Sequence, residues 1–114
     1  MGEILRRTDR WGREIVLDDD CWYGHVVRRR SYFSGRELDC VGEALTAPSL
    51  VTHDVDDLDR ECFYRPSPLP RPYGGLLVKV VVDFASADVA TGEGLVVTVH
   101  LTPKPKPGEQ QKWP

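Results

Sequence analysis

The chain has 114 residues, with 15 Lys or Arg, 18 Asp or Glu and a formal net charge of −3 at pH 7. A chain of this length supports one hydrophobic core rather than two, so we expect a single domain over residues 1–114. The acidic balance excludes a general attraction to nucleic acid, although basic side chains gathered on one surface would still bind phosphate locally.

The cysteine pattern and the hydropathy limit the class of protein further. Three widely spaced cysteines without a Cys-x-x-Cys pair argue against a disulfide framework and against a zinc site. No stretch approaches the 20 or so apolar residues that a membrane span needs, and residues 1–12 lack the apolar segment of a signal peptide. These features predict a cytoplasmic protein that does not enter a membrane and binds no metal.

The first half of the chain has the pattern of helices. Residues 14–17 are a short candidate strand, and the three aspartates at 18–20 follow them. Aspartates favour the first turn of a helix, so we prefer a cap for a helix over 21–30 to a metal carboxylate cluster. Residues 34–37 have the sequence of a capping box, and the apolar helical stripe after them should end before Pro48.

After Pro48 the pattern changes to strands. The candidate strands are residues 50–53, 60–65, 76–84 and 95–101. Residues 76–84 form the longest apolar run, in which seven of nine residues are Val, Leu or Phe. Because side chains alternate along a strand, Val78, Val80 and Val82 should share one face and Lys79 should lie on the other.

Lys79 is the one lysine inside this apolar run, and it has two interpretations. A lysine is costly to bury without a partner, so the strand could lie at the edge of the sheet, with the lysine reaching out to water. Alternatively, Lys79 lines a cleft and binds a negative charge.

The two ends of the chain read as accessory segments. Residues 1–10 are mostly polar and predict a flexible N-terminus, and residues 103–114 predict an extended tail rich in Pro and Lys. Between them, two helices followed by four strands predict an α+β domain. In this domain two N-terminal helices pack on one face of a four-stranded antiparallel β-meander, which leaves the other face available for a cleft.

Several segments, taken together, resemble one family. Residues 22–26, Trp-Tyr-Gly-His-Val, resemble the Trp-x-x-His-Ile opening of small domains from phages and mobile elements. Those domains are grouped with barnase, EndoU, colicin-type RNases and RelE toxins in one nuclease-toxin superfamily. The matching segments that follow in the same order are residues 45–48, 60–65, 77–82, 94–99 and 108–113. The chain departs from the family at Arg30, where a second His is common, and at His100, where a Tyr is expected.

The resemblance implies a RelE- or barnase-like fold and a metal-independent endoribonuclease without a cofactor. Cleavage by the ribose 2′-OH needs a group that accepts its proton, a group that protonates the 5′ oxygen, and cations that stabilise the phosphorane. His suits the proton transfers, and Arg and Lys suit the phosphate. The expected catalytic residues are His25, Arg65, Lys79, Thr98 and His100, and the expected RNA-binding residues are Arg28, Arg30, Arg60 and Tyr64.

Each of these residues also has a purely structural interpretation. The histidines can be hydrogen-bonded to the backbone or face solvent, residues 28–30 can form a solvated face, and Tyr64 can serve packing alone. A second hypothesis is therefore a non-catalytic binding or structural module that acts through a protein partner. The expected partners are RNA and a protein such as a neutralising antitoxin, with no membrane.

Overall fold

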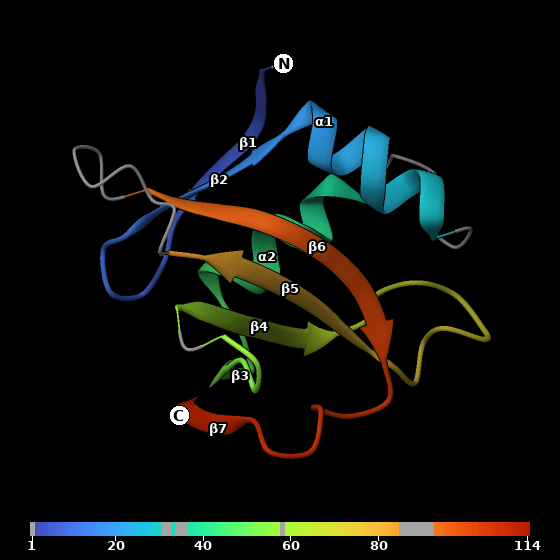
Figure 1. The fold of residues 1–114 in the computed structure, drawn as a ribbon. Coiled ribbons are helices and arrows are strands. Elements are labelled where there is room, and N and C mark those ends of the chain that lie inside the picture. The colour runs from blue at the N-terminus through green and yellow to red at the C-terminus, as the bar shows by residue number, and fades with distance from the viewer. Residues whose placement is uncertain (1, 31–32, 34–36, 58, 85–92) are drawn as a thin grey trace.

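The computed structural model describes residues 2–30, 33, 37–57, 59–84 and 93–114. It contains one seven-stranded sheet in the order β1-β2-β6-β5-β4-β3-β7, with short helical segments beside it (Figure 1). Neighbouring strands are antiparallel except β2 and β6, which are parallel. The elements are β1 (Glu3–Thr8), β2 (Glu14–Asp18), α1 (Asp19–Cys21), η1 (Trp22–Val27), α2 (Leu38–Thr46), β3 (Leu50–His53), β4 (Arg60–Pro66), β5 (Leu77–Asp83), β6 (Gly94–Thr102) and β7 (Gln110–Trp113).

The prediction of two helices on a four-stranded antiparallel meander is wrong. The meander β3–β6 is present, but the sheet is mixed and gains three further strands. Within residues 1–10, which we expected to be flexible, β1 pairs with β2 in an antiparallel hairpin. The expected tail at 103–114 ends in β7, which pairs with β3. Both errors concern polar segments that become strands because the existing sheet supplies their hydrogen-bond partners.

The helical segments are short and differ in form. Asp18 caps the first of them, because its carboxylate accepts a hydrogen bond from the Cys21 N–H over 2.7 Å. The chain then continues as the π-helix η1, and α2 follows at the position that the apolar stripe predicted. Residues 34–36 of the expected capping box lie outside the described residues. No helix of the described residues is long and apolar enough to cross a membrane.

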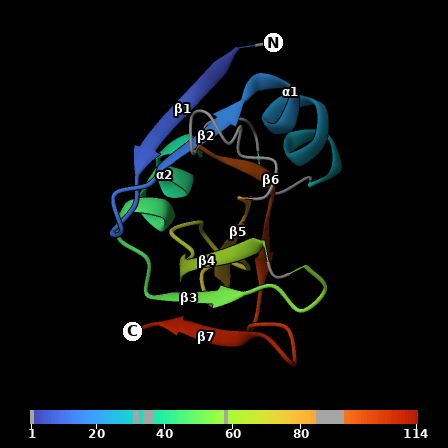
Figure 2. The same cartoon turned by 60° about the vertical axis from the view of Figure 1, so that its left-hand side comes forward.

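One face of the sheet, called the inner face here, holds the main core. It carries Val78, Val80 and Val82, as the alternation along β5 predicted, and α2 packs on it with Val41 and Leu45. Figure 2 shows the sheet curling around α2, from β1 at one end to β7 at the other. The opposite face, the outer face, carries a smaller cluster around Cys62, Tyr64 and Val81.

The curl brings the two edges of the sheet together at one corner. The Arg10 guanidinium, in the turn between β1 and β2, lies 4.0 Å from the centroid of the Trp113 ring on β7. Arg13 donates hydrogen bonds of 2.9 and 2.8 Å to the carboxylate of Glu61 on β4, and Lys112 on β7 pairs with the same carboxylate over 2.9 Å. The group Arg13, Glu61 and Lys112 is called the Glu61 cluster below.

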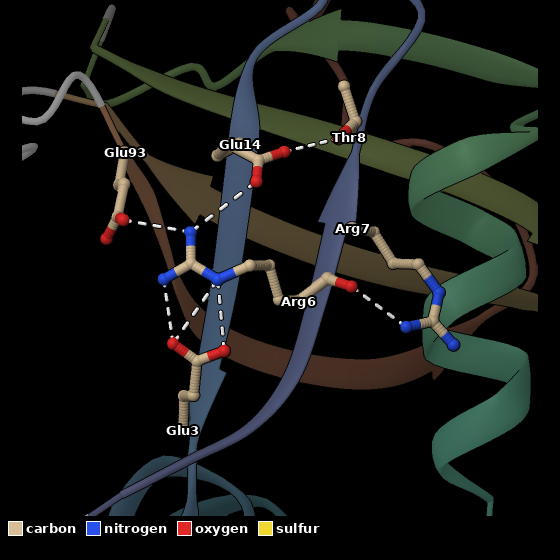
Figure 3. A network of polar contacts seen from close by, with 6 residues as sticks. All are labelled: Glu3, Arg6, Arg7, Thr8, Glu14 and Glu93. Atoms are coloured by element: carbon tan, nitrogen blue, oxygen red, sulfur yellow. Dashed lines mark hydrogen bonds and ion pairs between the residues drawn. The ribbon is translucent and has the colours of Figure 1, made fainter.

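A second polar network ties the N-terminal hairpin to the start of β6. Arg6 on β1 pairs with Glu3 over 2.7 Å, with Glu14 on β2 over 3.6 Å and with Glu93 over 2.9 Å. Figure 3 shows the three carboxylates gathered around this one guanidinium, with Thr8 bonded to Glu14 on the far side. These groups are at least partly exposed, so the network fixes geometry more than it stabilises the fold.

Candidate functional site

Three side chains that were predicted to be functional lie side by side on the outer face. In the strand register Lys79 on β5 faces Tyr64 on β4 and His100 on β6. The interpretation of Lys79 as an edge residue is wrong, because β5 is flanked by strands on both sides. Lys79 is only 6% exposed, and it therefore needs a buried partner.

That partner is Glu109, which comes from the segment after β6. The Lys79 ammonium donates a 2.8 Å hydrogen bond to Glu109 Oε2, and the Lys106 backbone N–H donates to the same oxygen over 3.0 Å. The hydroxyls of Thr52 and Tyr64 each donate to Oε1 over 2.5 Å. The Glu109 side chain is 0% exposed, so four donors replace its lost hydration.

Residues 103–109, which we call the strap, bring this carboxylate onto the outer face. Three prolines at 103, 105 and 107 keep the strap extended and deprive it of backbone donors. Gly108 has a φ of +93°, a left-handed conformation that favours glycine, and it turns the chain into β7. The Gln110–His53 pair then resumes the sheet immediately after Glu109.

The contacts of Glu109 set the ionisation of this group. Burial raises the pKa of Glu109, but hydrogen bonds from Lys79, Thr52 and Tyr64 outweigh burial, and the net pKa lies below its usual range. Burial and the hydrogen bond to Glu109 raise the pKa of Tyr64, so its hydroxyl stays protonated and donates. The pair is therefore an ionised carboxylate facing an ammonium group.

His100 differs from Lys79 in having unmet hydrogen-bonding capacity. Burial lowers the pKa of His100 to about 4, assisted by the positive charges of Lys79 and Arg30. The imidazole is thus neutral at pH 7 and can accept a proton. Two buried polar atoms on this face, His100 Nδ1 and Thr98 Oγ1, have no hydrogen-bond partner among the described residues.

A cavity of about 300 Å³ opens beside these groups. It lies between the outer face and the strap, and it is lined by Lys79, His100, Thr102 and residues 103–107. The volume is at the lower end of the range for small-molecule sites. Two lysines of the strap, Lys104 and Lys106, add positive charge to its wall, which suits an anionic ligand.

Other predicted residues lie away from this cavity. Arg65 points to the inner side, where it donates to the Ala47 carbonyl over 2.6 Å and lies 3.5 Å from the Glu43 carboxylate of α2. Arg60 lies 3.7 Å from Asp57 and 3.8 Å from Asp83. These arginines hold structural partners, and neither lines the cavity.

The predicted residues in and after η1 also differ in how close they lie to the outer-face site. His25 is half-buried in η1, Arg28 is exposed at its end, and neither lines the cavity. Arg30 is close enough to His100 to lower the pKa of the imidazole. The structure thus brings Lys79, His100, Tyr64 and Thr98 onto one face and leaves His25, Arg28, Arg60 and Arg65 outside the group.

Sequence reasoning missed the two residues that complete the site, Glu109 and Thr52. Glu109 follows a Pro-Lys segment that reads as a tail, and its one local signal is Gly108, which marks a turn. Thr52 reads as an ordinary strand residue. Among the described residues no group of three or more His, Cys, Asp or Glu side chains could hold a metal ion.

Comparison of the chain with protein-family models, with curated proteins and with solved structures finds no match. The geometry of the outer face and the sequence resemblance are therefore the only grounds for proposing a function.

Proposed function

We propose that this protein is a metal-independent endoribonuclease that binds an RNA phosphate in the cavity on the outer face. The observation that carries the proposal is the pairing of Lys79 with His100 across the β5–β6 ladder, with both side chains lining the cavity. A cation and a neutral imidazole at one anion-sized site are two of the groups that RNA cleavage needs. The resemblance to nuclease toxins supports the same reaction.

The proposed reaction uses His100 for both proton transfers and the lysines for the phosphate. The neutral imidazole of His100 takes the proton of the ribose 2′-OH while the 2′ oxygen forms a bond to phosphorus. The bond from phosphorus to the 5′ oxygen then breaks, and the imidazolium returns its proton to that oxygen. Lys79, with the strap lysines at 104 and 106, stabilises the extra negative charge of the phosphorane.

One observation favours the second hypothesis, a non-catalytic binding module. Lys79 is already neutralised by Glu109, whose carboxylate is fully buried. A cation that is permanently paired would serve the fold rather than a substrate. In that case the open part of the cavity would hold a group of a protein partner.

The test compares three histidine variants under identical conditions. Total RNA is incubated in EDTA with the wild type and with His100→Asn, His25→Asn and His53→Asn, and each variant is first shown to be folded by circular dichroism. We expect cleavage by the wild type and by His53→Asn, which changes the last residue of β3, and a loss of at least about 100-fold in His100→Asn.

The remaining outcomes separate the hypotheses. A loss in His25→Asn with full activity in His100→Asn would move the proton-transfer role to the helix that the family resemblance indicates. Absence of cleavage by the folded wild type would contradict an autonomous nuclease and favour the binding module.

A further inference from the structure

The bonds around Glu109 form a site for an anion rather than a simple ion pair. Three side-chain donors from three different strands, Thr52, Tyr64 and Lys79, converge on one carboxylate, and the Lys106 N–H completes the set. This group of four donors is called the anion cradle below. Because carboxylate and phosphate oxygens accept hydrogen bonds in the same way, the cradle is equally suited to a phosphate.

The anion that fills the cradle is attached to the body of the protein by few polar contacts. Apart from the bonds of Glu109, the described residues show two polar contacts between the strap and the rest of the protein. Thr102 donates to the Lys104 carbonyl over 2.8 Å, and Lys106 pairs with Asp56 over 3.2 Å. The Lys106–Asp56 pair is mostly exposed, so it contributes little.

Space for a second anion already exists beside the cradle. The cavity between the strap and the outer face reaches Lys79 and His100, so a phosphate can approach Lys79 without unfolding the sheet. Farther along the same face, Thr98 Oγ1 and His100 Nδ1 lack partners among the described residues. A ligand that entered here would meet polar groups that Glu109 leaves unsatisfied.

We propose that Glu109 is a built-in competitor that occupies the phosphate site, and that the strap must lift before a phosphate of the substrate can bind Thr52, Tyr64 and Lys79. This regulation rests on the proposed function, because the competing ligand is the RNA phosphate. A tethered carboxylate acts at a millimolar or higher effective concentration. A single free phosphate therefore displaces it poorly, whereas a polyanion that also engages Lys104 and Lys106 competes better.

The test removes the competitor and measures binding of inorganic phosphate. Glu109→Ala is compared with the wild type and with Glu14→Ala, which removes the same charge from the exposed hairpin. Thermal unfolding is followed against phosphate concentration, with chloride added to constant ionic strength. We expect stabilisation in Glu109→Ala alone, rising with the logarithm of the phosphate concentration above Kd, with Tm raised by roughly 5 °C at a concentration ten times Kd.

Two further variants keep the result decisive. Glu109→Ala combined with Lys79→Met should lose the phosphate effect, which places the bound anion in the cradle. If Glu109→Ala does not fold, Glu109→Gln keeps the volume of the side chain without its charge and should bind phosphate more tightly than the wild type. A folded Glu109 variant that phosphate stabilises no more than it stabilises Glu14→Ala would overturn the proposal.

An assay of RNA cleavage by the same variants separates this inference from the proposed function. If both are right, the Glu109 variant that binds phosphate also cleaves RNA faster than the wild type. If it binds phosphate and cleaves no RNA, the cradle stands as an anion site and the nuclease assignment fails.

Discussion

Two carboxylates of this protein each neutralise buried or half-buried cations, yet they are held in different ways. Glu61 belongs to β4, so the sheet itself fixes its position between Arg13 and Lys112. Glu109 reaches Lys79 from the strap, which follows the last strand of the meander. The burial of an ion pair and the firmness with which its segment is held are therefore separate properties. The more deeply buried carboxylate is the one on the more weakly attached segment.

The largest effect is expected from removing the cation of the buried pair. Lys79→Met would leave the Glu109 carboxylate without its ammonium partner in a site that is 0% exposed. We expect the free energy of unfolding to fall by about 3–5 kcal/mol, measured by urea denaturation. Replacing both residues by Met should restore much of this loss, and a single-variant loss below about 1 kcal/mol would show that water reaches the pair.

Removal of the carboxylate charge from the Glu61 cluster should cost less. Arg13 and Lys112 keep side-chain exposures of 25% and 24%, so water can replace part of what Glu61 provides. We expect Glu61→Gln to lower the free energy of unfolding by about 2 kcal/mol. A loss equal to that of Lys79→Met would remove the distinction between the two regions.

Acid should weaken the two regions in different pH windows. The folded pKa of His100, about 4, lies below the ordinary histidine value of about 6.5, because burial, Lys79 and Arg30 disfavour the imidazolium, although Glu109 favours it. Between pH 6.5 and 4 the unfolded chain binds a proton that the folded chain does not, so stability falls as pH falls. Glu61 and Glu109, whose pKa values are lowered, add their losses only below about pH 4.5.

The measurement is urea denaturation at a series of pH values. His100→Asn should flatten the slope between pH 6.5 and 4.5, whereas Glu61→Gln should keep it. An unchanged slope in His100→Asn would mean that the imidazole is as well hydrated in the folded protein as in the unfolded chain.

The smallest effect is expected at the corner where the sheet edges meet. Arg10 is exposed and stacks on Trp113, which corresponds to a cation–π contact worth about 0.5–1 kcal/mol. A double-mutant cycle of Arg10→Ala and Trp113→Ala would measure this coupling directly. A coupling energy near zero would leave closure of the corner to the Glu61 cluster and to the Lys112 ammonium, which lies 4.4 Å from the centroid of the Trp11 ring.

The parts of the fold that sequence predicted are those with local signals. Strands β3–β6 have apolar periodicity bounded by Pro and Gly, and they lie within about one residue of their predicted limits. Helix α2 ends as predicted but begins late, because Glu37, the last residue of the expected capping box, lies at its N-cap. In β1, by contrast, Leu5 is the one buried residue, and β7 contains none. These two strands exist because a sheet edge offers them hydrogen bonds, which no local pattern reveals.

In the candidate site, too, sequence could place the residues with a local pattern and could not place those that a distant segment positions. Alternation along β5 and β6 was enough to place Lys79, Thr98 and His100 on one face, once the register was known. Glu109 could not be placed, because its position depends on a strap that crosses the face and on the left-handed turn at Gly108. Arg65 was wrongly expected beside Lys79. The register pairs Lys79 with Tyr64, and because successive residues of a strand point to opposite faces, the next residue, Arg65, lies on the other face.

The seam between β2 and β6 has a consequence for the order of folding. The hairpin β1–β2 and the meander β3–β6 are each local in sequence, but their parallel pairing joins Ile15 to Gly94. A Cβ at Gly94 would lie 2.5 Å from Phe84 Cε1 and 2.8 Å from Val82 Cγ1, so a side chain at this position would have to displace Phe84 or Val82. Hairpins form in about 1–10 μs. We expect docking of the two preformed halves at this glycine to be the slow kinetic phase of refolding.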